Sequence, residues 1–273
     1  MSATNLYDHH KKAGNEGDIV KHPALIAALD ETLARTRHSP FRYADVFAGY
    51  AKNPLREGNE WPNGIGKIAG EHLLKGNRHV ALWAKWSGLK HAPRLGGVYP
   101  GSAWFAWKVC QRLKRTVELS LWETSPKPFK DLKATFRGSH QVFRRPASPN
   151  EPAIKRADFV FIDPPDKSHW ASIRELLGYV DAKKQSILIW LPIGPNTAQC
   201  PPAEDGLSEQ CRTEALKELK LSVSKIRWKS GGRTIGCQLL YSVNAKAKEA
   251  LREVVEEVVK TARWKFRPEH YDP

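Results

Sequence analysis

The sequence has few cysteines, and none of them form close pairs. Four of its 273 residues are cysteine, and no interval between them matches a metal-binding or redox pair. We therefore expect no metal site and no disulfide framework, and the pattern fits a reducing cytoplasm. The four residues are Cys110, Cys200, Cys211 and Cys237.

Long apolar segments are also missing. The N-terminal residues are polar, unlike a signal peptide, and no run of about 18 apolar residues occurs. Neither an internal repeat nor a low-complexity segment is present. The sequence therefore predicts a soluble, cytoplasmic protein without a membrane partner, and we expect it to be monomeric.

Acidic residues are fewer than basic ones. Asp and Glu number 29 against 44 Lys and Arg, which gives a formal net charge of +15. Such a surplus favours a polyanionic partner, because binding releases counterions from phosphates. We expect this partner to be nucleic acid, although a merely basic surface would have the same composition. Several of the ten tryptophans, among them Trp83 and Trp107, lie among lysines, which suits base stacking as well as a core.

Residues 158–166 have the pattern of a buried strand that stops abruptly. The apolar residues 159–162 favour a strand covered on both faces, and two prolines prevent its continuation beyond Asp163. Asp163 is therefore expected at the carboxyl end of a parallel strand, where open α/β sheets bind ligands. The arrangement resembles the Asp-Pro-Pro-aromatic corner of amino-group methyltransferases that use S-adenosylmethionine. This resemblance implies that Asp163 and the rigid Pro164–Pro165 pair orient an exocyclic amine.

Two further strands are predicted at 41–48 and 117–123, and each has features of a cofactor site. Gly49 closes the first, and a glycine turn after a strand lets the backbone approach a nucleotide. Glu123 ends the second, where it is placed to accept hydrogen bonds from ribose hydroxyls.

The remaining segments predict an α/β sheet with an insertion. Residues 52–98, with a helical pattern at 68–91, interrupt the alternation of strands and helices. We therefore predict a seven-stranded, mostly parallel sheet in residues 1–51 and 99–273, and an inserted helical subdomain at 52–98. The other predicted strands are 140–144, 158–162, 186–191, 221–229 and 235–243, and the predicted helices are 23–37, 103–114, 127–136, 169–180, 207–219 and 245–262.

Residues 7–22 are rich in His and Lys and precede any periodic pattern, so they predict a loop with a polar function. They resemble the N-terminal signature of the bacterial 23S ribosomal RNA methyltransferases that act on adenine N6, a family also described as external-DNA catabolism proteins. The signature is matched by Tyr7, His9, Ala13, Gly14, Asn15, Asp18, Ile19, Val20, Lys21 and His22. The family's Tyr-Pro-Gly-Ser turn is present at 99–102.

The resemblance implies a Rossmann-like class I methyltransferase sheet, S-adenosylmethionine as the cofactor and ribosomal RNA as the partner. Carried over by position, the cofactor or the transfer site would contact Lys21, His22, Asp45, Phe47, Gly49, Ser102, Glu123 and Asp163. The target nucleotide would contact Tyr7, His9 and the residue after the two prolines, Asp166.

The chain departs from the family pattern at three places. The loop after the first strand reads Asp-Val-Phe-Ala-Gly-Tyr-Ala at 45–51, so it loses one polar contact and one glycine. No acid stands at 146–148, where the family has an Asp-Gly pair that contacts the cofactor's adenine. The aromatic residue expected after the two prolines is Asp166. The chain is therefore a divergent member.

Three functions are compatible with these residues. The first is methyl transfer to a base amine of RNA, most simply adenine N6. The second is a nucleic-acid-binding module with a decayed methyltransferase site, which the net charge and Asp166 would fit. The third is a methyltransferase for a small molecule or a protein, which leaves the basic charge unexplained.

Overall fold

A computed structural model describes residues 9–138, 140–165, 169–193, 220–230 and 233–272. Its strands are β1 Phe41–Asp45, β2 Lys52–Pro54, β3 Val98–Pro100, β4 Val117–Trp122, β5 Gln141–Phe143, β6 Phe159–Ile162, β7 Ser186–Ile193, β8 Ser222–Ser230, β9 Arg233–Ser242 and β10 Glu269–Tyr271. Its helices are α1 His9–Lys12, α2 Asp18–Leu33, α3 Ile65–Ile68, the short 3-10 helix η1 Glu71–Leu74, α4 Arg78–Trp86, α5 Ser102–Arg112, α6 Pro126–Thr135, α7 Pro152–Lys155, α8 Trp170–Leu177 and α10 Ala245–Thr261.

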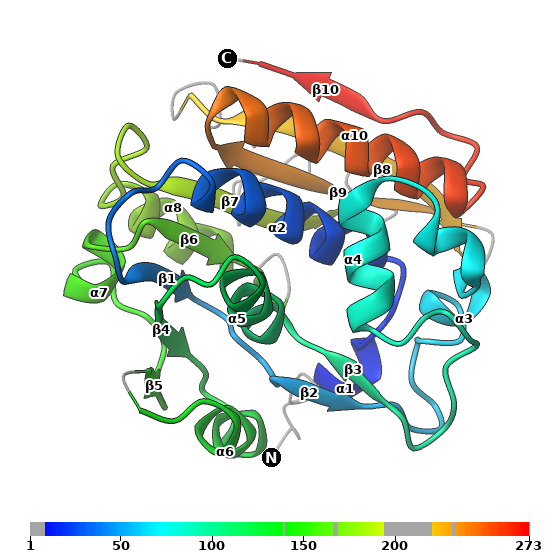
Figure 1. Cartoon of the computed structure of the whole chain (residues 1–273), viewed down its shortest axis with the longest axis horizontal. Helices are drawn as coiled ribbons and strands as arrows, with labels where there is room; N and C mark the ends of the chain where they lie inside the picture. Colours follow the sequence, from blue (N-terminus) through cyan, green and yellow to red (C-terminus); the bar gives the residue numbers. More distant parts are fainter. Residues whose placement is uncertain (1–8, 139, 166–168, 194–219, 231–232, 273) are drawn as a thin grey trace.

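The main sheet has the order β10-β8-β9-β7-β6-β1-β4-β5 (Figure 1). The five strands from β7 to β5 are parallel, and β9, β8 and β10 add in antiparallel fashion. The α/β fold expected of a class I methyltransferase is thereby confirmed. The prediction of seven strands was wrong, because the main sheet has eight. The additional strand is β10, whose three residues carry no pattern of their own and form a strand by pairing with β8.

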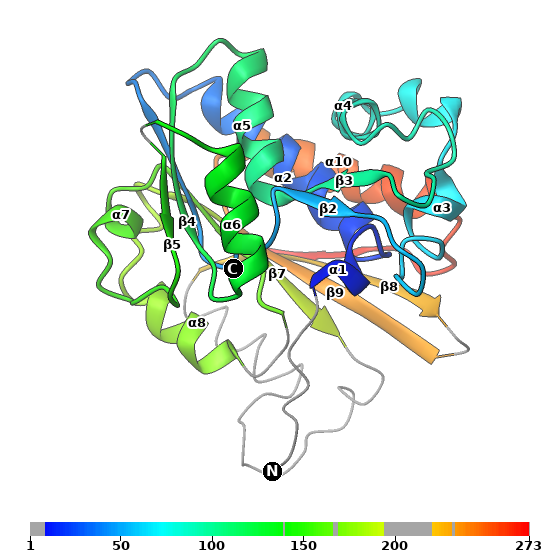
Figure 2. The ribbon, with the colours of Figure 1, turned by 90° about the horizontal axis from the view of Figure 1, so that it is seen from below.

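The central strand β6 is buried on both faces, as predicted. Phe159 and Phe161 enter a core formed with α2, α5 and α10, whereas Val160 and Ile162 enter a second core with α7 and α8. Successive side chains of a strand point to opposite faces, so this apolar run supplies both cores. Figure 2 shows the resulting layers, with α2, α5 and α10 on one face of the sheet and α7 and α8 on the other. None of the helices in the described parts of the chain has the length and apolarity to cross a membrane.

Helix α2 begins at Asp18, five residues before the predicted start at Pro23, which lies inside the helix. The cause is a reciprocal pair of contacts. The Asn15 side chain accepts a hydrogen bond from the backbone N–H of Asp18 at 3.1 Å, and the Asp18 carboxylate accepts one from the N–H of Gly14 at 2.6 Å. Such side-chain acceptors satisfy free N–H groups at a helix start. Lys21 therefore lies in the first turns of a helix and not in a loop.

Residues 52–98 combine the helices α3, η1 and α4 with two short strands that the sequence did not indicate. The strands β2 and β3 pair with each other and close the base of this segment. Its apolar side chains, including Leu55, Leu73 and Trp83, join the same core as α2 and α5. The division into a methyltransferase domain and an inserted subdomain remains a prediction.

Other elements follow the sequence pattern with shifted ends. β1 stops at Asp45, and the antiparallel pair predicted around residues 231–232 is formed by β8 and β9. α1 and α7 have four residues each and were not predicted, since so short a segment shows no helical period. The helix predicted at 207–219 lies outside the described residues.

An ion-pair network around the buried Asp30 carboxylate joins three helices on one face of the sheet. Asp30 of α2 accepts hydrogen bonds from His79 of α4 and from Arg112 of α5, and Arg78 lies 3.2 Å from the same carboxylate. Asp30, Glu31 and His79 bring three potential metal ligands within 4.8 Å of one another. Two guanidinium groups already balance the two carboxylates, so the cluster serves to hold α2, α4 and α5 together.

Candidate active site

Three acidic residues lie at the carboxyl ends of neighbouring parallel strands. Asp45 is the last residue of β1, and Glu123 and Asp163 directly follow β4 and β6. Because β6, β1 and β4 are adjacent in the sheet, these side chains lie at one edge of it. This edge is where open α/β sheets bind ligands.

Asp163 is held by a lysine from α2. Lys21 Nζ donates to Asp163 Oδ2 at 2.6 Å and lies 2.8 Å from Asp18 Oδ1. The Lys21 and Asp163 side chains are 14% and 17% exposed. Burial opposes the positive charge, but the carboxylates of Asp163 and Asp18 outweigh it and raise the pKa of the Lys21 ammonium. The cluster therefore carries one buried positive charge between two carboxylates.

His22 lies beside Lys21 and is held neutral. Its Nδ1 is 2.7 Å from Tyr99 Oη, and that hydroxyl also accepts a hydrogen bond from Trp83 Nε1 at 3.0 Å. The ring packs against Phe105, with centroids 5.0 Å apart. Burial lowers the pKa of His22 to about 3. This histidine can therefore take part in hydrogen bonding as an uncharged ring, and not as a cation at neutral pH.

Asp45 is fully buried and supports a neighbouring residue. Its Oδ2 accepts hydrogen bonds from Ser102 Oγ at 2.7 Å and from Tyr43 Oη at 3.0 Å. Burial raises the pKa of Asp45 to about 7, against the lowering effect of these two hydrogen bonds. Asp45 lines none of the three cavities described below, whereas Ser102 does. Its position is that of a residue that fixes Ser102.

The loop after β1 turns back at Gly49, whose φ of +60° favours glycine. It then meets the turn that precedes α5. A Cβ at Gly101 would lie 2.0 Å from the carbonyl oxygen of Tyr50, so only glycine allows this approach. The two turns together form the floor of a small polar cavity.

Two adjacent cavities lie along the strand ends. The first has a volume of about 160 Å³ and is mainly apolar. The second is smaller, about 60 Å³, and mainly polar. Phe47 and Pro165 line both. The first also contains Glu123 and Arg145, and the second contains Lys21, His22, Asp18, Gly49, Asn53 and Ser102.

A third cavity of about 480 Å³ opens beyond Asp163. It lies between the start of α2 and the strands β7, β8 and β9. Lys21 and Asp163 line both this cavity and the small polar one, and Pro165 lines all three. The Asp-Pro-Pro corner therefore stands where the three cavities meet.

The structure thus brings most of the residues singled out in the sequence to one edge of the sheet. Asp163, Pro165, Lys21, His22, Phe47, Gly49, Ser102 and Glu123 line the cavities, and Pro164 is buried beneath them. Asp45 lies behind Ser102. Tyr7 and Asp166 fall outside the described residues, and nothing is described of the His9 side chain, although its backbone lies in α1.

Sequence reasoning missed three residues of this region. Asp18, the second carboxylate on Lys21, belongs to the N-terminal signature but was not singled out as a site residue. Trp190 looked like one more apolar residue of a buried strand. Arg145 carries its charge to the first cavity and pairs with Glu151, a buried acid close to the region where the family has its Asp-Gly pair. The partners of Asp18 and Arg145 are only three and six positions away, but ion pairs at such spacings have no sequence pattern of their own. The approach of Trp190 to Asp163 depends on the pairing of β7 with β6.

No protein-family model and no curated protein matches this chain. Among solved structures it is similar to protein LPL1258 from Legionella pneumophila str. Philadelphia 1, described with family model DUF519. The TM-score is 0.72 at 17% identity, and the likeness covers 95% of this chain and 98% of that one. The two proteins share a fold.

Weaker likenesses are to methyltransferases. The METTL16 MTase domain gives a TM-score of 0.38 at 9% identity, covering 79% of this chain and 65% of that one. A putative class I S-adenosylmethionine-dependent methyltransferase from Listeria monocytogenes gives 0.41 at 8% identity, covering 88% and 64%. At such TM-scores neither likeness carries an argument on its own, so the fold assignment rests on the strand order and on the first protein.

Proposed function

We propose that this protein transfers a methyl group from S-adenosylmethionine to a base amine of RNA, most simply adenine N6. The observation that carries the proposal is the position of Asp163. Its carboxylate directly follows a central parallel strand, is paired with Lys21 at 2.6 Å, and lines two of the three cavities that share Pro165. The N-terminal signature and the Asp-Pro-Pro corner support the same function.

The residues present fit this cofactor. The apolar cavity beside Glu123 suits a nucleoside, because its walls can cover a flat base while a carboxylate accepts from ribose hydroxyls. The polar cavity beside Ser102, Asn53 and the loop at Gly49 suits an amino-acid group, which carries both donors and acceptors. Phe47 and Pro165 border both cavities, so the two proposed halves of the cofactor site are adjacent.

Catalysis would consist mainly of positioning. S-adenosylmethionine supplies the electrophile, a methyl carbon bound to a positively charged sulfur. The Asp163 carboxylate and the Pro164 carbonyl accept hydrogen bonds from the target amine and turn its lone pair toward that carbon. Lys21 holds Asp163 in place and keeps its charge, and the proline ring fixes the direction of the carbonyl.

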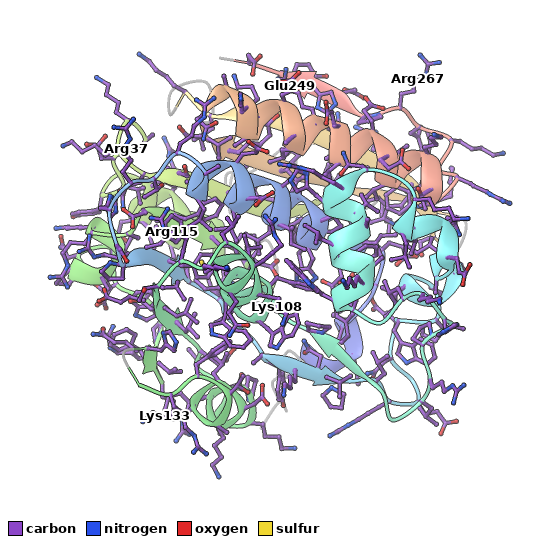
Figure 3. All side chains as sticks on the ribbon, in the orientation of Figure 1. Arg37, Lys108, Arg115, Lys133, Glu249 and Arg267 are labelled. Carbon is purple, nitrogen blue, oxygen red and sulfur yellow. The ribbon has the colours of Figure 1, made fainter. Side chains whose placement is uncertain are left out.

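The net charge supports RNA as the substrate class. A surplus of 15 positive charges attracts a polyanion. Basic side chains from several parts of the chain, including Arg37, Lys133 and Arg267, extend outward from the molecule in Figure 3. A base amine inside a duplex cannot reach the Asp163 corner, so the target would be single-stranded or flipped out.

Binding of the cofactor is tested first. Calorimetric titration of the purified full chain with S-adenosylmethionine and S-adenosylhomocysteine should give micromolar binding. Glu123→Ala should weaken it by at least tenfold, whereas Glu118→Ala should not, because Glu118 is a half-buried acid at the opposite end of β4 and lines neither cavity. If folded protein binds neither molecule, the enzyme proposal fails and a nucleic-acid-binding module with a decayed site takes its place.

The substrate is tested next. The protein is incubated with radiolabelled S-adenosylmethionine and with unmodified 23S ribosomal RNA transcript, matched single-stranded DNA or a cell-protein extract. Digestion of the RNA to nucleosides should give N6-methyladenosine, and added salt should reduce RNA affinity steeply. Label in the DNA or the protein fraction alone would contradict RNA as the substrate.

A further inference from the structure

The third cavity, in front of Asp163, is the largest of the three at about 480 Å³. This size falls within the range of roughly 300–1,000 Å³ in which small-molecule groups are bound. The Asp-Pro-Pro corner lines one side of this cavity, and aromatic rings line another. Its walls include Lys21, Asp163, Pro165, Trp190, Pro192 and Trp228.

Trp190 reaches this cavity because of strand register. β6 and β7 are parallel, and Ile162 pairs with Ile189. Asp163, which directly follows β6, and Trp190, an interior residue of β7, are therefore neighbours whose side chains point to the same face of the sheet. The indole is half-buried, so part of it is available to a ligand in the cavity.

The indole is also held in position. A Cβ at Gly17 would lie 2.8 Å from Cζ2 of Trp190, so the absence of a side chain at residue 17 makes room for the ring edge. Lys21 Nζ lies 5.2 Å from the ring centroid, within cation–π distance. The same ammonium is 2.6 Å from Asp163 Oδ2. Lys21 therefore contacts both the Trp190 ring and the Asp163 carboxylate, and it holds the ring in a fixed position relative to the carboxylate.

We propose that Trp190 supplies the aromatic surface on which the target base stacks while its amine meets Asp163. This inference rests on the proposed function and extends it to the substrate site. The residue after the two prolines is Asp166, which offers no ring. A tryptophan on the neighbouring strand offers one within the same cavity as Asp163. The ligand is a base of single-stranded RNA that carries an exocyclic amine. Its planar face stacks on the indole, as the face of any base can.

The test compares three single substitutions in the full chain. Trp190→Leu removes the ring but keeps an apolar side chain, and Trp190→Phe keeps a smaller ring. Trp107→Leu is the matched control. Trp107 is also half-buried with a lysine ammonium 5.8 Å from its ring, but it lines none of the three cavities described above. Equal thermal midpoints establish that the variants are folded.

Two readouts are needed. One is the KM for unmodified 23S transcript in methyl transfer, and the other is the affinity for a short single-stranded oligoadenylate with S-adenosylhomocysteine present. Loss of one stacked base should raise both constants roughly 5- to 150-fold in Trp190→Leu. Trp190→Phe should recover most of this loss, Trp107→Leu should resemble the wild type, and the Kd for S-adenosylhomocysteine should not change.

The outcomes separate this inference from the proposed function. If the wild type methylates RNA and Trp190→Leu stays within twofold of it, Trp190 is not the stacking surface and the proposed function stands. If the wild type binds oligoadenylate through Trp190 but transfers no methyl group, the enzyme proposal fails and the base site stands. If Trp190→Leu weakens cofactor binding as much as RNA binding, or the wild type does not bind oligoadenylate, the inference is overturned.

Discussion

Lys21 Nζ lies 2.6 Å from Asp163 Oδ2, although the two residues are 142 positions apart in the chain. The contact joins the first turns of α2 to the end of the central strand β6. It balances the carboxylate that we propose to orient the target amine, and it is largely shielded from solvent. The stability of the fold and the chemistry of the site therefore depend on the same ion pair.

Asp163→Asn should abolish most of the methyl transfer. The amide keeps the size of the side chain but loses the negative charge that holds the amine, so we expect kcat to fall by roughly 100-fold or more. Asp158→Asn is the control, because Asp158 precedes the same strand at its opposite end, where it contacts His38 and the backbone of Arg42. Single-turnover rates at saturating S-adenosylmethionine provide the measurement. Equal rates in both variants would remove Asp163 from the mechanism.

Lys21→Met should destabilise the protein, and the effect should depend on pH. Loss of one partner leaves two carboxylates buried without a cation, which costs about 3 kcal/mol of unfolding free energy at pH 7. The pKa of Asp18 is lowered in the wild type, since the Lys21 ammonium and the hydrogen bond from the Gly14 N–H outweigh the effect of burial. Its carboxylate therefore contributes stability above its unfolded pKa of 3.8 and loses it as the pH falls.

In Lys21→Met the deficit should accordingly shrink below about pH 4, where both buried acids can take up protons. Urea denaturation between pH 3 and about pH 8 measures this. Lys184→Met, which removes an exposed ion pair with Asp181, should change little at any pH. A deficit that stays constant with pH would contradict the charge-pair explanation.

Asp45→Asn should stabilise the protein at neutral pH, because it removes a carboxyl group whose ionisation destabilises the fold. Burial raises the pKa of Asp45 to about 7 from 3.8. The native state therefore binds the proton more tightly than the unfolded state, and stability is lost as the pH rises from about 4 to 7. The full effect is on the order of 4 kcal/mol. The amide oxygen of Asn can still accept from Ser102 and Tyr43, so the variant should be more stable than the wild type at pH 7 and equally stable at pH 4.

His22→Asn should change the pH dependence in the opposite sense. Burial lowers the pKa of His22 to about 3 from 6.5, so the unfolded state binds the proton more tightly. Its contribution is complete above pH 6.5 and is lost as the pH falls. Between pH 4 and 6.5 this effect and that of Asp45 should largely cancel in the wild type. Stability should therefore fall with rising pH in His22→Asn and rise in Asp45→Asn, and parallel curves for the two variants would contradict both assignments.

Local sequence alone was enough to locate the central strand and the acid that follows it. Residues 159–162 are all apolar and point alternately to the two faces of the strand, so both faces had to be buried in a core. The two prolines required the strand to end at Asp163. The hairpin of β8 and β9 was equally readable from its apolar runs and glycines. In each case the information lies within about ten neighbouring residues, where backbone stereochemistry and side-chain period decide the outcome.

Which side chains meet at the end of β6 depends on long-range packing and could not be read from the sequence. The sequence predicted a loop at Lys21. In the structure, hydrogen bonds to the side chains of Asn15 and Asp18 extend α2, so that the helix includes Lys21. Asp45 shares the strand-end position of Asp163 but faces Ser102 inside the core, and Trp190 reaches the third cavity only through the register of β7 on β6. These contacts depend on how helices pack on the sheet and how strands align, and residues far apart in the chain carry no local signal of either.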